Sequence, residues 1–528
     1  MIDLSGSARE PYAHQRVGVE WLVDSVRPEE GRLLPGGLFL ADEMRLGKTK
    51  QVIDAATVLW KRGEVRRVIV VCPAPVRDVW FDPELGELAK HRWPKCGIHA
   101  VSYHARRQEW TAGPDNRLQW VITNYEYIRH DIEYIGKRWR GPNLDPLLDA
   151  CDESTVLVLD ESIEVKNHRA LQHRACLVLR KKCGRVWLLN GTPIGHSPED
   201  LFGQAYVMDW RILGFQYKSA FMARHAVMDL GGYMVQTKWG KKPTQVLRWK
   251  EMDELQMKLA PYVLRRVRKD CLDLPPKLDP VTLTVPLGRE AWRTYRELRE
   301  EFITWLETGE TVSAAQAGVR AMRLAQVCAG FLGGLEPDPG EDEETGDLVT
   351  REVGREKLDL LLEWISNRLR EEPSLRMLVW CRFRPEARRI YRAVSERFPQ
   401  VHTELLIGGQ TRAERTEAVR LMHPEVLEAG PGMLVGTVHT GKFGLNFAGA
   451  HEVVYSSNDW SLHVRSQSED RPHGPGQTHP VGYHDLVTTG PAGEPTMDSL
   501  VLRALRGRRD LASQTVEYWQ RVLKEGGV

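Results

Sequence analysis

Short apolar runs without polar alternation recur along this chain, and stretches with helical periodicity separate them. Such runs are typical of strands that are buried on both faces, as in a parallel sheet covered by helices. They fall into two groups: residues 36–41, 67–72, 118–123, 155–160 and 185–190, and then residues 376–381, 403–407, 432–436, 452–456 and 481–487. The sequence therefore predicts an α/β protein with two parallel-sheet units.

The region between the two groups lacks this alternation. It holds aromatic residues, Met and helical stretches, and then the basic run LRRVRKD at 264–270 and LPPK at 274–277. A helical region at 286–330 follows, and an acidic, Gly- and Pro-rich segment at 336–350 is the best linker candidate. The expected organisation is a first lobe at 1–196, a helical extension at 197–277, a helical segment with the acidic linker at 278–350, and a second lobe at 351–528.

Composition excludes several classes of protein. The 528 residues are enough for two to four domains, and 73 basic against 72 acidic residues give a net charge of +1. Seven acidic residues lie within 336–347, so the rest of the chain carries a basic excess that is compatible with a nucleic-acid partner. Eight cysteines without a CxxC motif disfavour zinc modules and disulfide frameworks. Without a signal sequence or an apolar span, we expect a cytoplasmic protein with no membrane partner.

Two motifs carry the predicted chemistry. LADEMRLGKTKQ at 40–51 lies between a predicted strand and a predicted helix, where backbone N–H groups and Lys48 can hold phosphate and Thr49 can hold Mg²⁺. VLVLDES at 156–162 places Asp160 and Glu161 at the end of a strand, where they suit metal binding and orientation of a water molecule. Each motif also has a purely structural interpretation: the first is a helix that begins in GKT by chance, and the second is a solvated turn after a core strand. The occurrence of both motifs in one chain disfavours these interpretations.

The motifs and their order resemble the Swi/Snf family of helicase-like, DNA-dependent ATPases, in a compact bacterial or phage form. The matching blocks, in family order, are PYAHQRVGVEWL and ADEMRLGKTKQ (11–51), VVCPAPVRDVW (70–80), VITNYE (121–126), DESIEVKN (160–167), LNGTP (189–193), PYVLRRVRKD with LPPK (261–277), VWCRFRPEAR (379–388), GLNFAGAHEVVYSSNDWS (444–461) and QSEDRPHGPGQ (467–477). They span almost the whole chain.

The resemblance implies two RecA-like lobes that hold ATP between them, with double-stranded DNA across both; forked or branched DNA is an alternative form of this partner. It assigns the adenine to Gln15, the phosphates and Mg²⁺ to Lys48 and Thr49, and the metal and the attacking water to Asp160 and Glu161. Arg45 and Gly47 would line the nucleotide, Thr192 would couple the lobes, and Gln467 and Arg471 would face the nucleotide from the second lobe. Residues expected near the DNA backbone are Pro73 to Trp80, Thr123, Lys166, Thr437, Lys442 and Asn446. Protein partners are also possible.

Four positions depart from the family pattern. Arg45 replaces the first glycine of GLGKT, Gly474 replaces the second arginine of the last motif, Ile163 replaces the histidine of DEAH, and Lys442 replaces a glycine. Arginine at a glycine position strains the loop or crowds the nucleotide. The pair Arg45 and Gly474 has three interpretations: a weakened ATPase, compensation in which Arg45 supplies the missing cation, or substitutions in a competent enzyme.

Two functions from different classes follow. The first is an ATP-driven motor that moves along double-stranded DNA and remodels complexes bound to it. The second is a non-catalytic clamp that binds DNA or a partner protein, with the nucleotide as a switch. The sequence leaves open whether the pathway is replication, repair or defence. The acidic segment at 336–347 is a tether or a DNA-mimicking gate.

Overall fold

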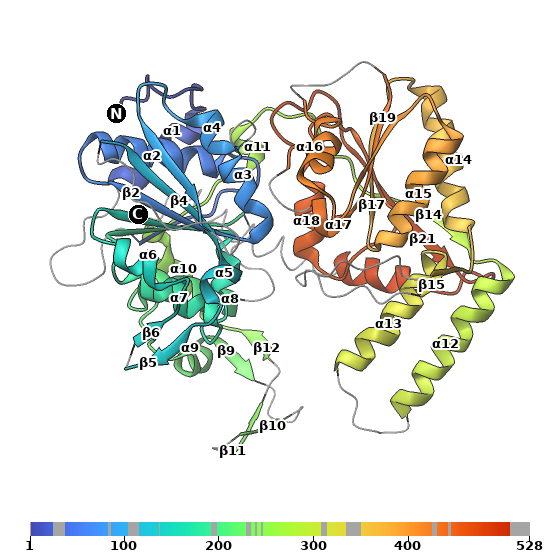
Figure 1. Ribbon diagram of the computed structural model, residues 1–528. Coiled ribbons are helices and arrows are strands. Elements are labelled where there is room, and N and C mark those ends of the chain that lie inside the picture. The colour runs from blue at the N-terminus through green and yellow to red at the C-terminus, as the bar shows by residue number, and fades with distance from the viewer. Residues whose placement is uncertain are drawn as a thin grey trace. The chain divides into compact units, whose positions relative to one another are not determined.

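The computed structural model describes residues 2–24, 37–82, 86–103, 116–136, 138–191, 198–228, 234–237, 240–243, 246–307, 314–333, 350–424, 430–441 and 445–506. The acidic segment 336–347, Thr192 and Lys442 lie outside these residues. The chain forms two compact units, Met1–Leu272 and Asp273–Leu511 (Figure 1). Among the described residues, no helix is long and apolar enough to cross a bilayer.

The first unit contains a parallel sheet of seven strands in the order β13-β1-β8-β7-β2-β4-β3. Its strands are β1 (Gly37–Leu40), β2 (Arg67–Cys72), β3 (Ile98–Ser102), β4 (Leu118–Asn124), β7 (Thr155–Asp160), β8 (Arg185–Leu189) and β13 (Val263–Leu264). All five apolar runs of the first group form strands here. The adjacent ends of β1, β8 and β7 lie at one edge of the sheet, where ligands of open α/β sheets bind.

Helices cover this sheet, with α1, α2 and α4 on one side and α6, α7, α8 and α10 on the other in Figure 1. The helices of the unit are α1 (Ala13–Asp24), α2 (Lys48–Lys61), α3 (Arg77–Phe81), α4 (Glu87–His91), α5 (Tyr125–Arg129), α6 (Asp145–Ala150), α7 (Leu171–Arg180), α8 (Glu199–Asp209), α9 (Lys218–His225), α10 (Met252–Leu259) and α11 (Arg268–Cys271). Short antiparallel ribbons pair β5 (Glu133–Ile135) with β6 (Arg138–Arg140), β9 (Ala226–Met228) with β12 (Val246–Trp249), and β10 (Met234–Thr237) with β11 (Gly240–Pro243). The segment 197–277, expected to be helical, therefore also contains strands.

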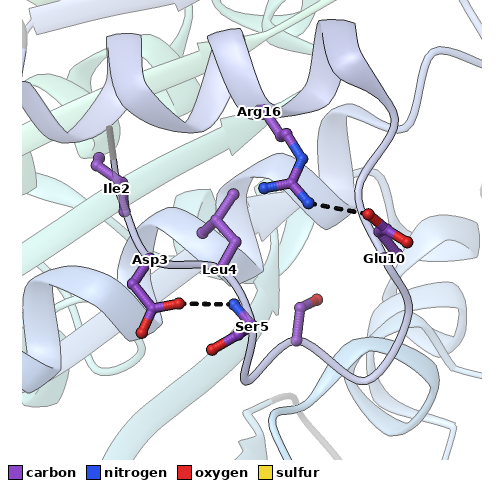
Figure 2. Close-up of a pocket in the computed structure, with 7 residues that line it drawn as sticks. Ile2, Asp3, Leu4, Ser5, Glu10 and Arg16 are labelled. Carbon is purple, nitrogen blue, oxygen red and sulfur yellow. Dashed lines mark hydrogen bonds and ion pairs between the residues drawn. The ribbon is translucent and has the colours of Figure 1, made fainter.

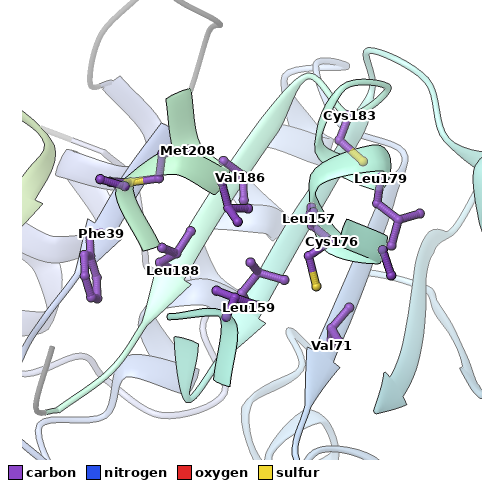
Figure 3. Close-up of a cluster of buried hydrophobic side chains, with 14 of the residues drawn as sticks. Phe39, Val71, Leu157, Leu159, Cys176, Leu179, Cys183, Val186, Leu188 and Met208 are labelled. Atoms are coloured by element: carbon purple, nitrogen blue, oxygen red, sulfur yellow. The ribbon is translucent and has the colours of Figure 1, made fainter. Parts of the chain in front are cut away.

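Apolar side chains from both layers form the core of this unit. Figure 3 shows Leu157, Leu159, Val186 and Leu188 on the strands facing Cys176 and Leu179 of α7 and Met208 of α8. Each of these side chains is fully buried. The strands carry apolar residues on both faces because helices cover both faces, which explains the absence of alternation in the sequence.

The second unit contains a parallel sheet of six strands in the order β14-β21-β20-β17-β19-β18. The strands are β14 (Val281–Pro286), β17 (Arg376–Cys381), β18 (His402–Leu406), β19 (Gly432–Thr437), β20 (Glu452–Tyr455) and β21 (Gly482–Thr489). The helices are α12 (Arg289–Glu307), α13 (Ala314–Cys328), α14 (Glu356–Glu371), α15 (Arg384–Arg397), α16 (Arg412–Arg420), α17 (Val438–Gly441) and α18 (Leu462–Glu469), and a ribbon pairs β15 (Phe331–Gly333) with β16 (Thr350–Glu352). Two parallel-sheet lobes with helical material between their strand groups confirm the predicted fold class.

Candidate active site

The phosphate loop joins β1 to α2 at the carboxyl edge of the first sheet. Gly47 precedes helix α2 with φ of 72°, and because it has no side chain, the first N–H groups of the helix stay open to an anion. The ammonium group of Lys48 donates to the carbonyl oxygens of Asp42 at 2.8 Å and Glu43 at 3.4 Å. The ammonium group of Lys48 therefore lies against the backbone of its own loop.

Lys48 lies within the electrostatic field of two carboxylates at the end of β7. Burial lowers the pKa of Lys48, and the charges of Glu161, Asp42 and Asp160 oppose that change. Burial and the adjacent Glu161 raise the pKa of Asp160 to about 6, against the opposing effects of a hydrogen bond from Trp80 and the charge of Lys48. The predicted phosphate-binding lysine and the predicted carboxylate pair are therefore brought together.

Two aromatic side chains hold Asp160 in place. The indole of Trp80 donates to Asp160 Oδ2 at 2.8 Å, and the hydroxyl of Tyr125 donates to the Asp160 carbonyl oxygen at 3.0 Å. Trp80 is expected near DNA from the family resemblance, and the structure gives it this contact with the carboxylate. The only sequence signal for it is the position of Trp80 shortly after β2, which neighbours β7.

Gln15 of α1 packs directly against the phosphate loop. Its amide nitrogen donates to the Leu46 carbonyl oxygen at 3.3 Å, and its amide oxygen accepts from the backbone N–H of Tyr12 at 3.1 Å. A Cβ atom on Gly47 would lie 2.3 Å from the Gln15 amide nitrogen, so a larger residue at this left-handed position would be strained and would displace the Gln15 side chain. The structure brings Gln15 to the loop, and its role toward adenine stays a prediction.

Arg45 and Ile163 are two positions in the first unit that depart from the family pattern. Arg45 has φ of 73°, the left-handed conformation that glycine adopts without strain. Its guanidinium acts on Glu87 of α4: burial would raise the pKa of Glu87, but His91, Lys90 and Arg45 together lower it. Ile163 is buried and adds an apolar contact where the family has a histidine.

The residues expected near DNA in the first unit differ in accessibility. Thr123 in β4 is fully buried, and its hydroxyl has no hydrogen-bond partner within the described part of the chain. Lys166 is partly exposed and lies 3.8 Å from a carboxylate oxygen of Asp200. Pro73 is buried directly after β2. A contact of DNA with Thr123 would need its surroundings to open, and all three assignments stay predictions.

The second unit carries the remaining predicted residues. Gln467 of α18 and Arg471 just beyond it are 2% and 4% exposed. At the end of β19 the hydroxyl of Thr437 lies 2.8 Å from that of Thr440, and Asn446 Oδ1 accepts from the Ala448 N–H at 3.3 Å. Gln15, Lys48, Asp160 and Glu161 come together in the first unit, and the roles of Gln467 and Arg471 stay predictions.

Beside Gln467 and Arg471, the same helix contributes a buried ionic cluster. Arg465 binds Glu469 and Asp485, and its guanidinium lies 3.5 Å from the ring centroid of Tyr455. The sequence analysis did not find this cluster. It fixes α18 against β20 and β21, and thereby fixes the backbone that carries Gln467.

A separate hollow of about 530 Å³ lies beside the segment before α1. Figure 2 shows the pair Arg16–Glu10, at 3.1 Å, and the Ser5 N–H donating to Asp3. The lining residues are Ile2, Asp3, Leu4, Ser5, Ser7, Glu10 and Arg16. None of the predicted site residues lines this hollow, so it is distinct from the site around Lys48.

The donor set around Lys48 fits Mg²⁺ together with a polyphosphate. Within the described residues, no cluster of three or more His, Cys, Asp or Glu side chains is arranged to hold a metal. Magnesium usually takes one or two carboxylates and completes its shell with water and substrate phosphates. Burial and Glu161 raise the pKa of Asp160, so a cation bound beside it would stabilise its ionised form.

Two parallel-sheet units, the first with a phosphate-loop geometry beside paired carboxylates, define a class of nucleotide-binding α/β protein. The chain belongs to the SNF2-related family, because the family model described as SNF2-related domain matches residues 14–330, more than half of its length. This match confirms the resemblance to the Swi/Snf family.

Individual relatives are distant. The putative ATP-dependent helicase/translocase YwqA of Bacillus subtilis is 25% identical over 96% of this chain and 48% of that protein. The mouse DNA annealing helicase and endonuclease ZRANB3 is 24% identical over 91% of this chain and 39% of that protein. The chain thus spans half or less of the length of these relatives. The Sulfolobus solfataricus SWI2/SNF2 ATPase core in complex with dsDNA is 20% identical, with a TM-score of 0.42 over 99% of this chain and 97% of that one.

Proposed function

We propose that this protein is an ATP-dependent translocase that moves along double-stranded DNA and remodels complexes bound to it. The observation that carries the proposal is that Lys48, at the start of the helix after β1, and the pair Asp160 and Glu161, at the end of β7, lie at the same carboxyl edge of one parallel sheet. Membership of the SNF2-related family supports it. The relatives whose names include helicase or translocase activity support it further.

In the proposed reaction, the ammonium of Lys48 and the first N–H groups of α2 bind the phosphates of ATP. Glu161 accepts a proton from the attacking water, and the oxygen of that water bonds to the γ-phosphorus. At the same time the bond between the γ-phosphorus and the β–γ bridging oxygen breaks, which leaves ADP and phosphate as products. Asp160, held by Trp80, and Thr49 would hold Mg²⁺, which neutralises phosphate charge when bound.

The second unit would complete the reaction and the grip on DNA. We propose that Arg471 and Gln467 face the nucleotide, that Thr192 couples the two lobes, and that the DNA backbone contacts Pro73, Thr123, Lys166, Thr437, Lys442 and Asn446. Hydroxyls, amides and scattered cations suit a protein that follows phosphates without reading base sequence. A cytoplasmic location suits a protein that uses ATP and DNA. Forked DNA and protein partners also belong to the proposal.

The deciding experiment measures phosphate release with and without linear duplex, single-stranded and forked DNA. We expect duplex DNA to stimulate turnover in the wild-type protein, and Glu161→Gln to abolish turnover while nucleotide binding persists. Glu153→Gln is the matched control, because Glu153 is an exposed glutamate shortly before the same strand. Turnover that is indifferent to DNA, or that survives Glu161→Gln, would contradict the proposal.

A clamp without turnover is the second candidate, and the conformation of Arg45 is the observation that favours it. A side chain held at φ of 73° in the phosphate loop occupies a position where glycine normally leaves room for phosphate. The same experiment separates the two functions: a clamp binds nucleotide and duplex DNA with no phosphate release in any condition.

A further inference from the structure

A short segment, residues 263–268, runs along the phosphate loop, and we call it the arginine strap. It begins as β13, which extends the sheet beyond β1 with Phe39 opposite Val263 and Leu40 opposite Leu264. The pairing continues past the strand, because the N–H of Ala41 donates to the Leu264 carbonyl at 2.8 Å and that of Glu43 to the Arg266 carbonyl at 2.9 Å. The strap therefore follows the first residues of the loop.

Two arginines of the strap satisfy carboxylates of the loop. Arg266 donates to Asp42 Oδ1 at 2.9 Å and to the amide oxygen of Gln51 at 2.7 Å. The backbone N–H of Arg268 donates to Glu43 Oε2 at 2.6 Å. These contacts are ordinary structural pairs, since each buried charge or donor meets an opposite group.

Arg265 differs from its neighbours. It is 9% exposed, and within the described residues it has no ion pair and its Nε atom has no hydrogen-bond partner. One nitrogen, Nη1, donates to two carbonyl oxygens, that of Ala41 at 3.0 Å and that of Gly191 at 3.2 Å. Ala41 directly follows β1 and Gly191 lies just beyond β8, so a single guanidinium joins the ends of two adjacent strands.

The second of these strand ends lies against the phosphate-binding lysine. A Cβ atom on Gly191 would lie 3.6 Å from the ammonium nitrogen of Lys48 and 2.7 Å from Met44 of the loop. Gly191 thus lies between Arg265 and Lys48, and Gly191 also begins the GTP sequence of the LNGTP motif. An apolar side chain would fill the place of Arg265 without the desolvation of a buried charge. The retained guanidinium therefore points to a role beyond packing.

We infer that Arg265 is a positioning residue for nucleotide hydrolysis, which ties the ends of β1 and β8 together and so sets Gly191 against Lys48. The inference rests on the proposed ATPase function of the same site. The strap pairs with Ala41 and Glu43 of the loop, and its Arg265 reaches Gly191 beyond β8, so a displacement of the strap would act on both strand ends.

The test compares Arg265→Lys and Arg265→Gln with the matched variant Arg62→Lys in the full chain. Lysine keeps the charge and glutamine keeps a donor, but neither reproduces the shape of the guanidinium. Arg62 is an exposed arginine at the end of α2, and its pair with Asp24 is solvated. The first readout is hydrogen exchange of the amides in 41–43 and 189–191, which needs no turnover.

We expect exchange in both amide segments to rise about tenfold in the two Arg265 variants, and to stay unchanged in Arg62→Lys. We also expect kcat to fall about 10- to 100-fold while KM for ATP changes less than about threefold, because misplaced groups affect the reaction more than binding. Unchanged exchange at either segment overturns the inference. A rise in KM for ATP that accounts for the whole loss of kcat/KM also overturns the inference, because Arg265 would then bind the phosphates directly.

Failure of the proposed function has a different signature. A wild-type protein without DNA-stimulated turnover refutes the proposed ATPase, whereas the exchange data still decide whether Arg265 ties the two strand ends. Thermal unfolding of each variant is the final check. If both Arg265 variants fail to fold, the residue serves the stability of the core and the inference is wrong.

Discussion

Two residues at the candidate site have side chains on left-handed backbone. Arg45 in the phosphate loop has φ of 73°, and Glu161 at the end of β7 has φ of 51°. This conformation costs a residue with a Cβ atom about 1–2 kcal/mol. Strain of this kind gathers where the surrounding structure fixes a side chain for function. Glu161 fits this description as the proposed base, whereas Arg45 stands at a family glycine.

Arg45→Gly should therefore stabilise the protein. We expect the free energy of unfolding to rise by about 1 kcal/mol, because glycine adopts this backbone without strain, and ATPase activity to stay level or rise, because glycine leaves room for phosphate. Urea unfolding and steady-state turnover measure both effects. Glu251→Gly is the matched control, since Glu251 has φ of 53° at the start of α10, outside the site. A tenfold loss of turnover in Arg45→Gly would instead support compensation for Gly474.

Asp160 should make the metal-free protein less stable as pH rises. Its pKa in the folded state is about 6 against 3.8 for the free side chain, so the folded protein binds the proton more tightly than the unfolded chain does. The destabilisation is absent below about pH 4 and complete above the folded pKa, where it reaches at most about 3 kcal/mol. The free energy of unfolding of Asp160→Asn should therefore equal that of the wild type at pH 4 and exceed it at pH 7.5. Urea titrations in the presence of EDTA measure both values. An equal difference at both pH values would refute the raised pKa.

The strand elements show what periodicity can and cannot predict. Arg67–Cys72, Thr155–Asp160 and Arg376–Cys381 form strands over the predicted residues, because both faces of each are buried and the apolar run needs no partner to be recognised. Three edge strands of the two main sheets were missed. β13 has two residues, and β3 and β14 have only partly buried or exposed side chains, so pairing with a neighbouring strand defines all three.

Helix α2 depends on a buried ion pair that ties it to two other segments. Asp54 accepts from Lys50 at 2.8 Å, from Ser7 at 3.0 Å and from the indole of Trp93 at 2.7 Å. Its side chain is completely buried and that of Lys50 is 6% exposed. The pair therefore links the N-terminal segment and the region after α4 to the helix that begins at the phosphate loop.

Asp54→Ala should lower the free energy of unfolding by about 3 kcal/mol, because the substitution leaves the ammonium of Lys50 buried without its carboxylate. Thermal and urea unfolding test this value. Asp24→Ala is the comparison, since it breaks the exposed pair with Arg62 and should change stability by less than about 1 kcal/mol. Equal effects of the two substitutions would show that the buried pair adds nothing.

Across the whole molecule, the sequence indicates the candidate site residues better than it indicates the side chains that hold them. Lys48, Asp160 and Glu161 follow from motifs whose residues lie close together in the chain. Trp80 and Arg266 were not predicted as site contacts, because Trp80 reaches Asp160 across 80 residues and Arg266 reaches Asp42 across 224. Such contacts depend on strand order, and a single sequence contains no local signal for strand order.

The residues proposed to act on the nucleotide are divided between the two units. Gln15, Lys48, Asp160 and Glu161 all belong to the first unit, whereas Arg471 belongs to the second. Lys48→Ala should therefore abolish binding of a fluorescent ATP analogue. Arg471→Ala should leave its Kd within about threefold and lower DNA-stimulated kcat about 10³-fold, the effect of removing an arginine that stabilises the transition state.

Arg471 is buried, so its loss also tests the fold, and Arg471→Lys with thermal unfolding separates the two effects. Arg397→Ala is the matched control, because Arg397 is an exposed arginine at the end of α15 in the same unit. If Arg471→Lys folds normally and keeps full turnover, the second unit contributes no charge to the reaction. Hydrolysis would then belong to the first unit alone, and the second would act only in gripping DNA.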